Sequence, residues 1–241
     1  SSAVWFEEVA AERGIDFRFE SGHLKNYYMP EIMAGGAALF DMDNDGDLDA
    51  YLVQGGSLTA APDSRPPNQL YRNDGGGAFE SVAENGGSGD RGYGMGVAAG
   101  DYDSDGDPDL YVTNVGANVL LRNEGDGRFA DVTAIGGVGD EAWSASAAFV
   151  DYDADGDLDL FATKYMHWSA ALERPCFSPV GESDYCYPPV YNAQAPDLLY
   201  RNNGDGTFAE IAFEAGLHAA YGYGLGVVSG NFNADGQADI F

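Results

Sequence analysis

Four stretches of nine residues carry an oxygen-bearing side chain at positions 1, 3, 5 and 9 and a glycine at position 6. We call them acidic loops 1 to 4; they span residues 41–49, 101–109, 151–159 and 231–239. Calcium takes about six to eight oxygen ligands and tolerates irregular geometry, so it suits such a loop better than magnesium. The glycine permits the sharp turn, and position 7 is expected to supply its backbone carbonyl. The loops predict about four calcium sites, with ligands at Asp41, Asp43, Asp45, Asp47, Asp49, Asp101, Asp103, Asp105, Asp107, Asp109, Asp151, Asp153, Asp155, Asp157, Asp159, Asn231, Asn233, Asp235, Gln237 and Asp239.

An Asp-Gly turn on an acidic surface, without a metal, is the alternative interpretation. Each of the first three loops holds five carboxylates within nine residues. At such separations carboxylates repel one another unless a cation lies between them, and the repetition favours the metal site. Asn231, Asn233 and Gln237 leave loop 4 only two carboxylates, so we expect it to bind calcium less tightly.

The residues around the loops indicate strands. An EF-hand requires a glutamate at position 12 and helices on both sides, but position 12 is Leu52, Val112 or Ala162. The runs at 109–113 and 159–163 are apolar, with aromatic and β-branched residues, as in strands. Each acidic loop therefore joins two strands.

The loops belong to a longer repeat, because their first residues are separated by 60, 50 and 80 positions. Each unit has small residues before the loop, a strand after it, a strand that ends in Arg-Asn, and a strand with an aromatic and an aliphatic anchor, such as Phe129 and Val132. Glycine-rich turns such as 124–127 indicate hairpins. Four antiparallel strands per unit predict β-propeller blades. A β-sandwich or a parallel solenoid would not need small residues in the first strand, which crowds the propeller axis.

The loops, the Tyr-Arg-Asn turn at 71–73 and the Phe-x-x-Val strand at 79–82 resemble the FG-GAP/VCBS repeat family, which includes integrin α-chain propellers. The chain most resembles the cartilage acidic protein type and its bacterial relatives. The resemblance covers essentially the whole chain and implies calcium at the loop positions named above. It also implies a ring of seven blades.

Residues 1–241 are expected to form one propeller domain, with blades at about 33–82, 94–132 and 144–211 and a partial blade at 222–241. Residues 5–9 match a fourth strand without the three before it, so residues 1–15 are expected to form a closing strand. We expect the chain to be part of a longer polypeptide whose ring closes internally. Alternatively, residues 5–15 complete a blade of a neighbouring molecule, which would make the protein a subunit of an extracellular fibre.

Composition excludes some partners and suggests a compartment. With 40 acidic and 11 basic residues the formal charge is −29, which excludes nucleic acid, because its binding needs a basic surface. No stretch reaches 18 apolar residues, so no membrane span is expected. Cys176 and Cys186 lie in an insertion at about 166–196 and are expected to form a disulfide rather than to bind a metal. A disulfide and calcium loops that need millimolar calcium together predict a secreted, extracellular protein.

Catalytic motifs are not recognisable, because His23, His167 and His218 have no partner at a known catalytic spacing. The long segments are expected at the end of the blades opposite the acidic loops. Binding residues commonly lie on loops held by a rigid frame, so this end is the expected ligand surface. Ligand-contact candidates are Tyr93, Trp143 and Tyr223, which begin first strands, and Trp168 and Tyr187 in the insertion; inter-blade packing is the alternative for the first group. We expect a non-catalytic adhesion or recognition module for glycan or protein ligands. The alternatives are the fibre subunit and a calcium-dependent polysaccharide-active enzyme.

Overall fold

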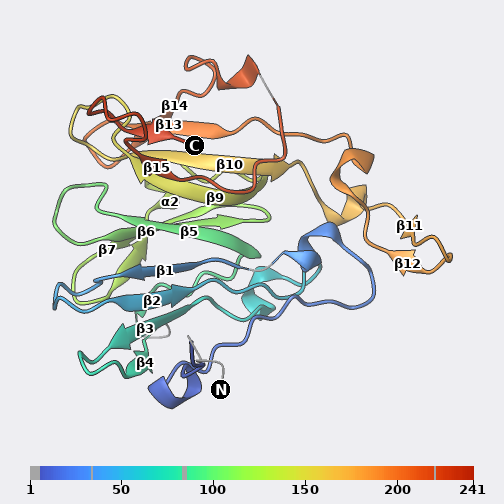
Figure 1. The fold of residues 1–241 in the computed structure, drawn as a ribbon, viewed down its shortest axis with the longest axis horizontal. Coiled ribbons are helices and arrows are strands. Elements are labelled where there is room, and N and C mark those ends of the chain that lie inside the picture. The colour runs from blue at the N-terminus through green and yellow to red at the C-terminus, as the bar shows by residue number, and fades with distance from the viewer. Residues whose placement is uncertain (1–5, 34, 83–85, 220) are drawn as a thin grey trace.

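A computed structural model describes residues 6–33, 35–82, 86–219 and 221–241. The described chain is all-β apart from short helical turns, and its main elements are three four-stranded antiparallel sheets that stack side by side (Figure 1). Their strands are β1 (Ala37–Phe40), β2 (Asp49–Leu52), β3 (Gln69–Asn73) and β4 (Phe79–Ser81); β5 (Gly94–Gly100), β6 (Asp109–Asn114), β7 (Val119–Asn123) and β8 (Phe129–Asp131); and β9 (Trp143–Val150), β10 (Asp159–Met166), β13 (Leu198–Asn202) and β14 (Phe208–Glu210). These sheets are propeller blades, so the predicted fold class is confirmed.

A fourth, partial blade consists of the two strands β15 (Ser229–Gly230) and β16 (Asp239–Ile240). The remaining elements are the small hairpin β11 (Cys176–Phe177) and β12 (Ser183–Asp184), the one-turn helix α2 (Thr133–Gly136), and the 3-10 turns η1 (Ala11–Arg13), η2 (Met29–Ile32), η3 (Pro62–Ser64), η4 (Ala170–Leu172), η5 (Pro188–Val190) and η6 (Leu217–Ala219). No helix in the described ranges is long and apolar enough to cross a membrane. The seven-bladed ring stays a prediction.

The small residues in the first strands are explained by the close approach of neighbouring blades. Neighbouring first strands β1, β5 and β9 contact one another. A Cβ atom on Gly36 would lie 2.9 Å from the Cα of Gly96, and one on Gly96 would lie 2.7 Å from the carbonyl oxygen of Ala145. The blades approach too closely for larger side chains at these positions.

Larger side chains fill the space between blades away from the axis. Phe40 of the first blade meets Phe129 of the second at 6.4 Å between ring centroids, and Tyr102 of the second meets Phe208 of the third at 5.4 Å. Phe129 and Phe208 are the aromatic anchors of the fourth strands, and both are buried. In the second and third blades the anchor strand therefore packs on the blade before it.

The closing strand predicted within residues 1–15 is not formed in the described part of that range. Residues 6–9 are irregular, and the chain then enters η1; Trp5 lies outside the described residues. A strand forms only where a neighbouring strand accepts its hydrogen bonds. The partial blade supplies strands one and two, and no third strand among the described residues lies between them and residues 6–9.

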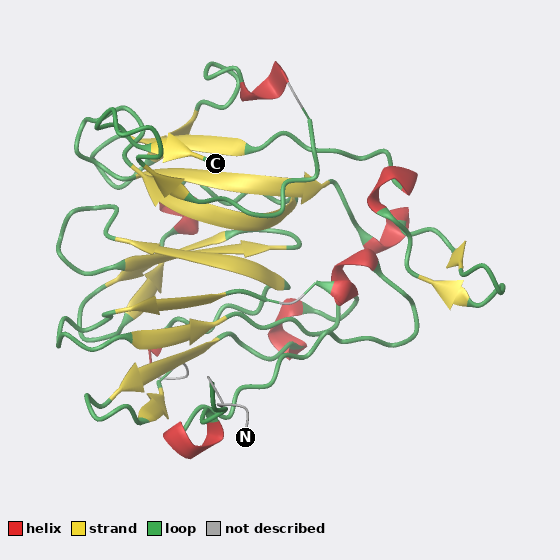
Figure 2. Ribbon diagram, viewed as in Figure 1, coloured by secondary structure: helices red, strands yellow, loops and turns green. Residues whose placement is uncertain are grey.

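The acidic loops and the long connections lie at opposite ends of the strands. In Figure 1 the turns from β1 to β2, from β5 to β6 and from β9 to β10 are on one side, whereas the insertion that carries β11 and β12 projects from the other. Figure 2 shows the short helical turns of the insertion on that second side. The strands therefore separate the surface of the acidic loops from the surface of the long connections.

Candidate metal sites

The first carboxylate of each of the first three loops holds the turn in shape. Asp41 Oδ1 accepts the backbone N–H of Asp45 at 3.1 Å, and Asp41 Oδ2 accepts that of Gly46 at 2.9 Å. Loops 2 and 3 repeat these contacts from Asp101 and Asp151. Gly46 has a φ of +91°, a left-handed conformation that glycine adopts without steric cost.

The ninth residue of each of these loops is fully buried and ties the loop to its blade. Asp109 Oδ2 accepts the backbone N–H of Tyr102 at 3.1 Å, and Asp109 Oδ1 accepts that of Asn123 at 2.8 Å. Asp49 and Asp159 make the same two contacts. Each of these loops is therefore organised around a buried carboxylate, independently of any bound ion.

Three carboxylates converge in each of the first three loops, with one oxygen from each within 4.8 Å of the others: Asp41, Asp43 and Asp45; Asp101, Asp103 and Asp109; and Asp151, Asp153 and Asp159. Asp43 Oδ1 is buried and has no hydrogen-bond partner among the described residues. A buried, unpaired carboxylate oxygen beside two further carboxylates fits a hard cation, which would satisfy the oxygen and offset the repulsion.

Burial changes the protonation of these carboxylates. Desolvation raises the pKa of Asp109 to about 8 and that of Asp159 to about 6, and the nearby charges of Asp103 and Asp153 act in the same direction. Desolvation, together with Asp45 and then Asp41, also raises the pKa of Asp43. The acidic clusters are therefore electrostatically unfavourable when metal-free.

In the metal-free protein we expect stability to fall as the pH rises from about 4 to about 8. The pKa of Asp109 is 3.8 before the shift and about 8 in the folded protein. The folded state therefore holds this proton more tightly, and the stability contribution is complete below pH 3.8 and lost as the pH rises through 8. The melting temperature of protein freed of metal on a chelating resin, measured between pH 5 and 8, checks this.

The control for this pH effect is Asp109→Asn, in which the dependence should become shallower because the titrating group is gone. With saturating calcium the trend should reverse, since protons compete with the ion for the same oxygens. A metal-free melting temperature that rises with pH would contradict the assignment.

The side chain at position 7 of loop 2 lies outside the carboxylate cluster of its loop. Asp107 Oδ1 accepts the side-chain amide of Asn44, in loop 1, at 2.6 Å. The prediction for position 7 concerned its backbone carbonyl, and the outward side chain leaves that carbonyl free to act. Acidic loops 1 and 2 are thus also connected to each other.

Loop 4 differs from the other three in its contacts. The side-chain amide of Asn233 donates to Asp235 Oδ2 at 3.1 Å and to Asp239 Oδ1 at 3.4 Å. An amide N–H therefore lies between the two carboxylates of this loop, in the region where a cation would bind. The weaker binding of calcium there stays a prediction.

The asparagine that ends the third strand of the second and third blades bridges to the preceding blade, a role that the sequence pattern does not reveal. Asn123 Nδ2 donates to the carbonyl of Met42 in the preceding blade at 2.8 Å and to that of Pro108 at 3.2 Å. Asn202 does the same with Tyr102 and Leu158. The recurring Arg-Asn pair is the available signal, but its local sequence indicates only a turn.

Replacing this asparagine should loosen the contact between blades. We expect Asn123→Ala to cost about 1–3 kcal/mol, because it leaves buried carbonyls without a donor. Asn203→Ala is the matched control; among the described residues its exposed side chain hydrogen-bonds to Thr207 of its own hairpin, and it should cost less than about 0.5 kcal/mol. Urea denaturation of both variants measures the difference, and equal costs would refute the proposed bridge.

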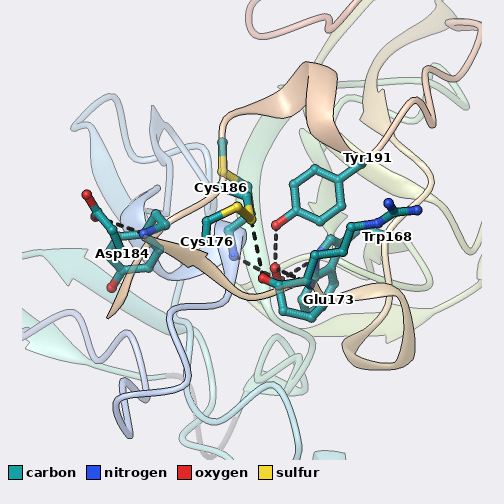
Figure 3. Close-up of a disulfide and its surroundings, with 9 residues drawn as sticks. Trp168, Glu173, Cys176, Asp184, Cys186 and Tyr191 are labelled. Atoms are coloured by element: carbon teal, nitrogen blue, oxygen red, sulfur yellow. Dashed lines mark hydrogen bonds between the residues drawn. A yellow bond between two sulfur atoms is a disulfide. The ribbon is translucent and has the colours of Figure 1, made fainter. Parts of the chain in front are cut away.

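The surface opposite the loops is organised by the insertion. Cys176 and Cys186 form the predicted disulfide, with Cα atoms 5.3 Å apart. Figure 3 shows Glu173 beside it, where its carboxylate accepts the Trp168 indole N–H at 3.0 Å and the Tyr191 hydroxyl. These contacts hold the insertion in one conformation.

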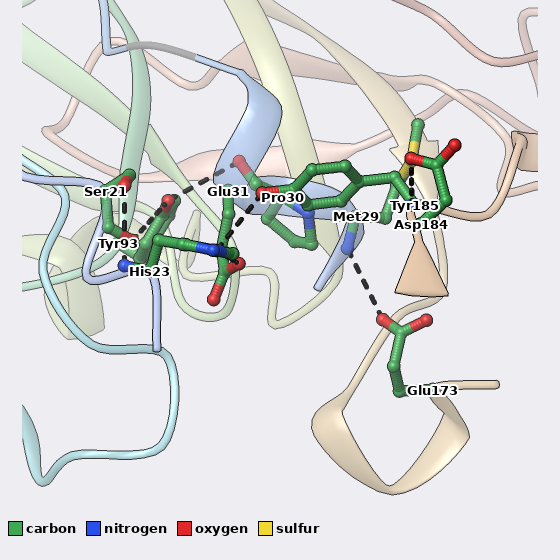
Figure 4. A network of polar contacts seen from close by, with 9 residues as sticks. All are labelled: Ser21, His23, Met29, Pro30, Glu31, Tyr93, Glu173, Asp184 and Tyr185. Carbon is green, nitrogen blue, oxygen red and sulfur yellow. Dashed lines mark hydrogen bonds and ion pairs between the residues drawn. The ribbon is translucent and has the colours of Figure 1, made fainter. Parts of the chain in front are cut away.

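A segment before the first blade packs against the insertion. His23 Nδ1 lies 2.7 Å from Glu31 Oε2 and 3.2 Å from the Tyr185 hydroxyl. Figure 4 shows this network, in which the backbone N–H of Met29 also donates to Glu173 at 3.4 Å. Two segments about 150 residues apart in sequence thus cover the strand ends together.

This cover corrects part of the predicted ligand surface. Tyr93 and Trp143 are fully buried, because they pack with Met29, Tyr165 and Cys186 beneath the cover. They pack between blades and under the insertion and form no exposed rim. The other three candidates are more accessible: Trp168 and Tyr223 are half-buried, and Tyr187 is 67% exposed.

Comparison with known proteins identifies related repeats. The FG-GAP-like repeat matches residues 41–112 and 101–162, which together make up just over half of the chain. Cartilage acidic protein 1 of Xenopus tropicalis is 45% identical over 49 residues, and that of Homo sapiens is 43% identical over 49 residues. Each match covers 20% of this chain and only 8% or 7% of the relative.

A distant likeness to a solved structure was also found. It is an Agrocybe aegerita lectin described as specifically recognising non-reducing terminal N-acetylglucosamine. The two share 20% sequence identity with a TM-score of 0.42, and the match covers 84% of this chain and 44% of the lectin.

Proposed function

The chain belongs to the FG-GAP-like repeat family, and on that premise we propose that it is a calcium-stabilised, extracellular β-propeller module that recognises a ligand without catalysis. The observation that carries this proposal is the division of the molecule into two ends. Convergent carboxylates lie at one end, and long connections tied by a disulfide lie at the other. Binding residues commonly lie on loops that a rigid scaffold positions.

Calcium would be held in loops 1 to 3 by the side chains at positions 1, 3, 5 and 9 and by the carbonyl at position 7. Its charge would offset the mutual repulsion of the carboxylates and stabilise the end of each blade. Loop 4 would be the weaker, fourth site, since the amide of Asn233 already bridges its two carboxylates.

Location outside the cell is supported by the disulfide between Cys176 and Cys186, because disulfides persist in oxidising compartments. The formal charge of −29 favours a ligand that is not a polyanion. A glycan or a protein surface of low negative charge meets both conditions.

The contacts that the loop carboxylates and the histidines make favour a binding role over catalysis. The carboxylates at positions 1 and 9 accept backbone N–H groups of their own blade. His23 contacts Glu31 and Tyr185, and the ring of His218 lies against Phe213. These contacts hold structure in place.

Tyr187 is the best candidate for ligand contact, because it is exposed on the insertion and lies next to the disulfide. Exposed aromatic side chains are enriched where binding energy concentrates. We expect saturable, calcium-dependent binding to at least one member of a panel of immobilised glycans and matrix proteins, lost in Tyr187→Ala. Phe232→Ala, at an exposed position on loop 4, is the matched control. If calcium-loaded protein shows no saturable binding to any member of the panel, the proposal is refuted.

A further inference from the structure

Each blade is closed by a polar contact at the end of its second strand, opposite the acidic loops. In blade 1 the backbone N–H of Gln54 donates to Asn68 Oδ1 at 2.7 Å, and Asn68 Nδ2 donates to the Tyr51 hydroxyl at 3.0 Å. The equivalent residues in blade 2 are Asn114, Asn118 and Tyr111, at 2.9 and 3.1 Å. Both contacts consist of neutral groups.

The third blade replaces these neutral groups by charged ones. Its equivalent residues are Lys164, Asp197 and Phe161, and the Lys164 backbone N–H donates to Asp197 Oδ1 at 2.8 Å. Phe161 has no hydroxyl to close the contact. The Lys164 side chain reaches Asp140, with Nζ 2.8 Å from Oδ2, where the neutral Asn114 amide of blade 2 donates to Asp90 at 3.2 Å. A lysine that is only 6% exposed is unusual unless it is paired or serves a site.

A cavity of about 380 Å³ lies beside this ion pair, lined by Asp140, Lys164, Leu198, Tyr200, Glu210 and His218 among others. This volume is within the usual range of ligand sites, about 300–1,000 Å³. Tyr200 is 4% exposed; its hydroxyl makes no hydrogen bond within the described ranges and is not among their fully buried unpaired atoms, so it is accessible from the cavity. The Lys164 ammonium has three hydrogens, and Asp140 is the one acceptor found for them among the described residues.

We propose that this cavity binds a neutral sugar residue through two adjacent hydroxyl groups. The ammonium donor and the carboxylate acceptor lie 2.8 Å apart, so one sugar hydroxyl accepts from Lys164 while its neighbour donates to Asp140. The Tyr200 hydroxyl supplies a third polar contact, and Leu198 supplies an apolar wall for the C–H face of the ring. The inference rests on the proposed recognition function and names its ligand class and location.

The charges around the cavity select against ionic ligands. Asp140 and Glu210 would repel a carboxylate or a phosphate, and the formal charge of −29 adds to this. A cationic ligand would compete with Lys164 for Asp140. A neutral diol satisfies the donor and the acceptor together without displacing either, through charge-assisted hydrogen bonds.

The test uses the calcium-loaded chain and methyl glycosides of glucose, galactose and mannose as neutral probes, with methyl glucuronide as the anionic probe. Isothermal titration calorimetry should give saturable binding of at least one neutral glycoside and weaker binding of the glucuronide. Tyr200→Phe should weaken that binding roughly fivefold to tenfold, and Lys164→Met roughly tenfold to a hundredfold. Tyr71→Phe is the matched control in blade 1, where the hydroxyl donates to Asp16 instead, and it should leave the affinity unchanged.

Melting temperatures in calcium show that each variant is folded; Tyr200→Phe removes a hydroxyl that has no hydrogen-bond partner in the described part of the chain, so it should keep the wild-type value. Preference for the glucuronide, or neutral binding that survives both Tyr200→Phe and Lys164→Met, would overturn the proposal. If panel binding depends on Tyr187 while no glycoside binds, the cavity proposal fails and the recognition function stands. If neither assay gives binding, both fail.

Discussion

Chelation of calcium is expected to lower the melting temperature by about 15 °C or more. A ligand at 100 times its dissociation constant stabilises the folded state by about 2.7 kcal/mol. Three equivalent sites would therefore contribute about 8 kcal/mol, and a chain of this size loses about 2–4 °C for each kcal/mol. Differential scanning calorimetry in millimolar calcium, and then in excess chelator at pH 7.5, measures the change.

Calcium, and not magnesium, should restore the melting temperature after chelation, because magnesium demands near-octahedral geometry and dehydrates reluctantly. Magnesium at the same concentration is therefore the control for ionic strength and non-specific screening. An unchanged melting temperature in chelator would show that the acidic loops are not metal sites. Full rescue by magnesium would refute the choice of cation.

Asp109→Ala is expected to have the largest effect of any single substitution in the loops, about 4–8 kcal/mol in calcium. It leaves the buried N–H groups of Tyr102 and Asn123 without an acceptor, each at a cost of about 1–3 kcal/mol. It also removes an expected metal ligand. Urea denaturation gives the change in stability, and calorimetric titration should give one calcium site fewer.

Asp107→Ala is the matched control in the same loop. Its carboxylate contacts Asn44, and the expected ligand at this position is the backbone carbonyl, so the cost should stay below about 1 kcal/mol with the same number of sites. Should Asp109→Ala fail to fold, Asp109→Asn keeps one acceptor oxygen and makes the comparison possible. Equal effects at positions 107 and 109 would contradict the assigned roles.

The repeat architecture could be predicted because its signals are local. An acidic loop is nine consecutive residues, and the strand after it is apolar and β-branched from its first positions, as in Asp109–Asn114. Turn chemistry at 124–127 and the spacing of the loops then define the blade. These features do not depend on which residues lie far apart in sequence but close in space.

The ligand surface could not be predicted in the same way. Tyr93 and Trp143 begin their strands as an exposed aromatic rim would, and their own sequence neighbours do not reveal that they are covered. The cover comes from residues 17–33 and from the insertion, joined through Glu173 and His23. Long-range pairing of this kind depends on where the blades bring the two segments, which periodicity does not encode.

The strand predicted at residues 5–9 stays a prediction, and residues 6–9 are irregular in the described chain. Its pattern matches a fourth strand, but a strand exists only when a neighbouring edge accepts its hydrogen bonds, and the described residues place no such edge beside residues 6–9. Lys164 is a comparable case, since its apolar neighbours indicate a strand but not the ion pair with Asp140 that lies across the blade boundary.

The blades, the acidic loops and the pairing of two cysteines ten residues apart could thus be predicted from local sequence patterns, because each depends on contacts between near neighbours in the chain. The burial of particular aromatic side chains, the asparagine bridges between blades and the cavity beside a buried lysine could be seen only in the folded protein. Those outcomes depend on surfaces that meet only after the blades have stacked, when burial and unpaired polar groups are set by partners from other repeats.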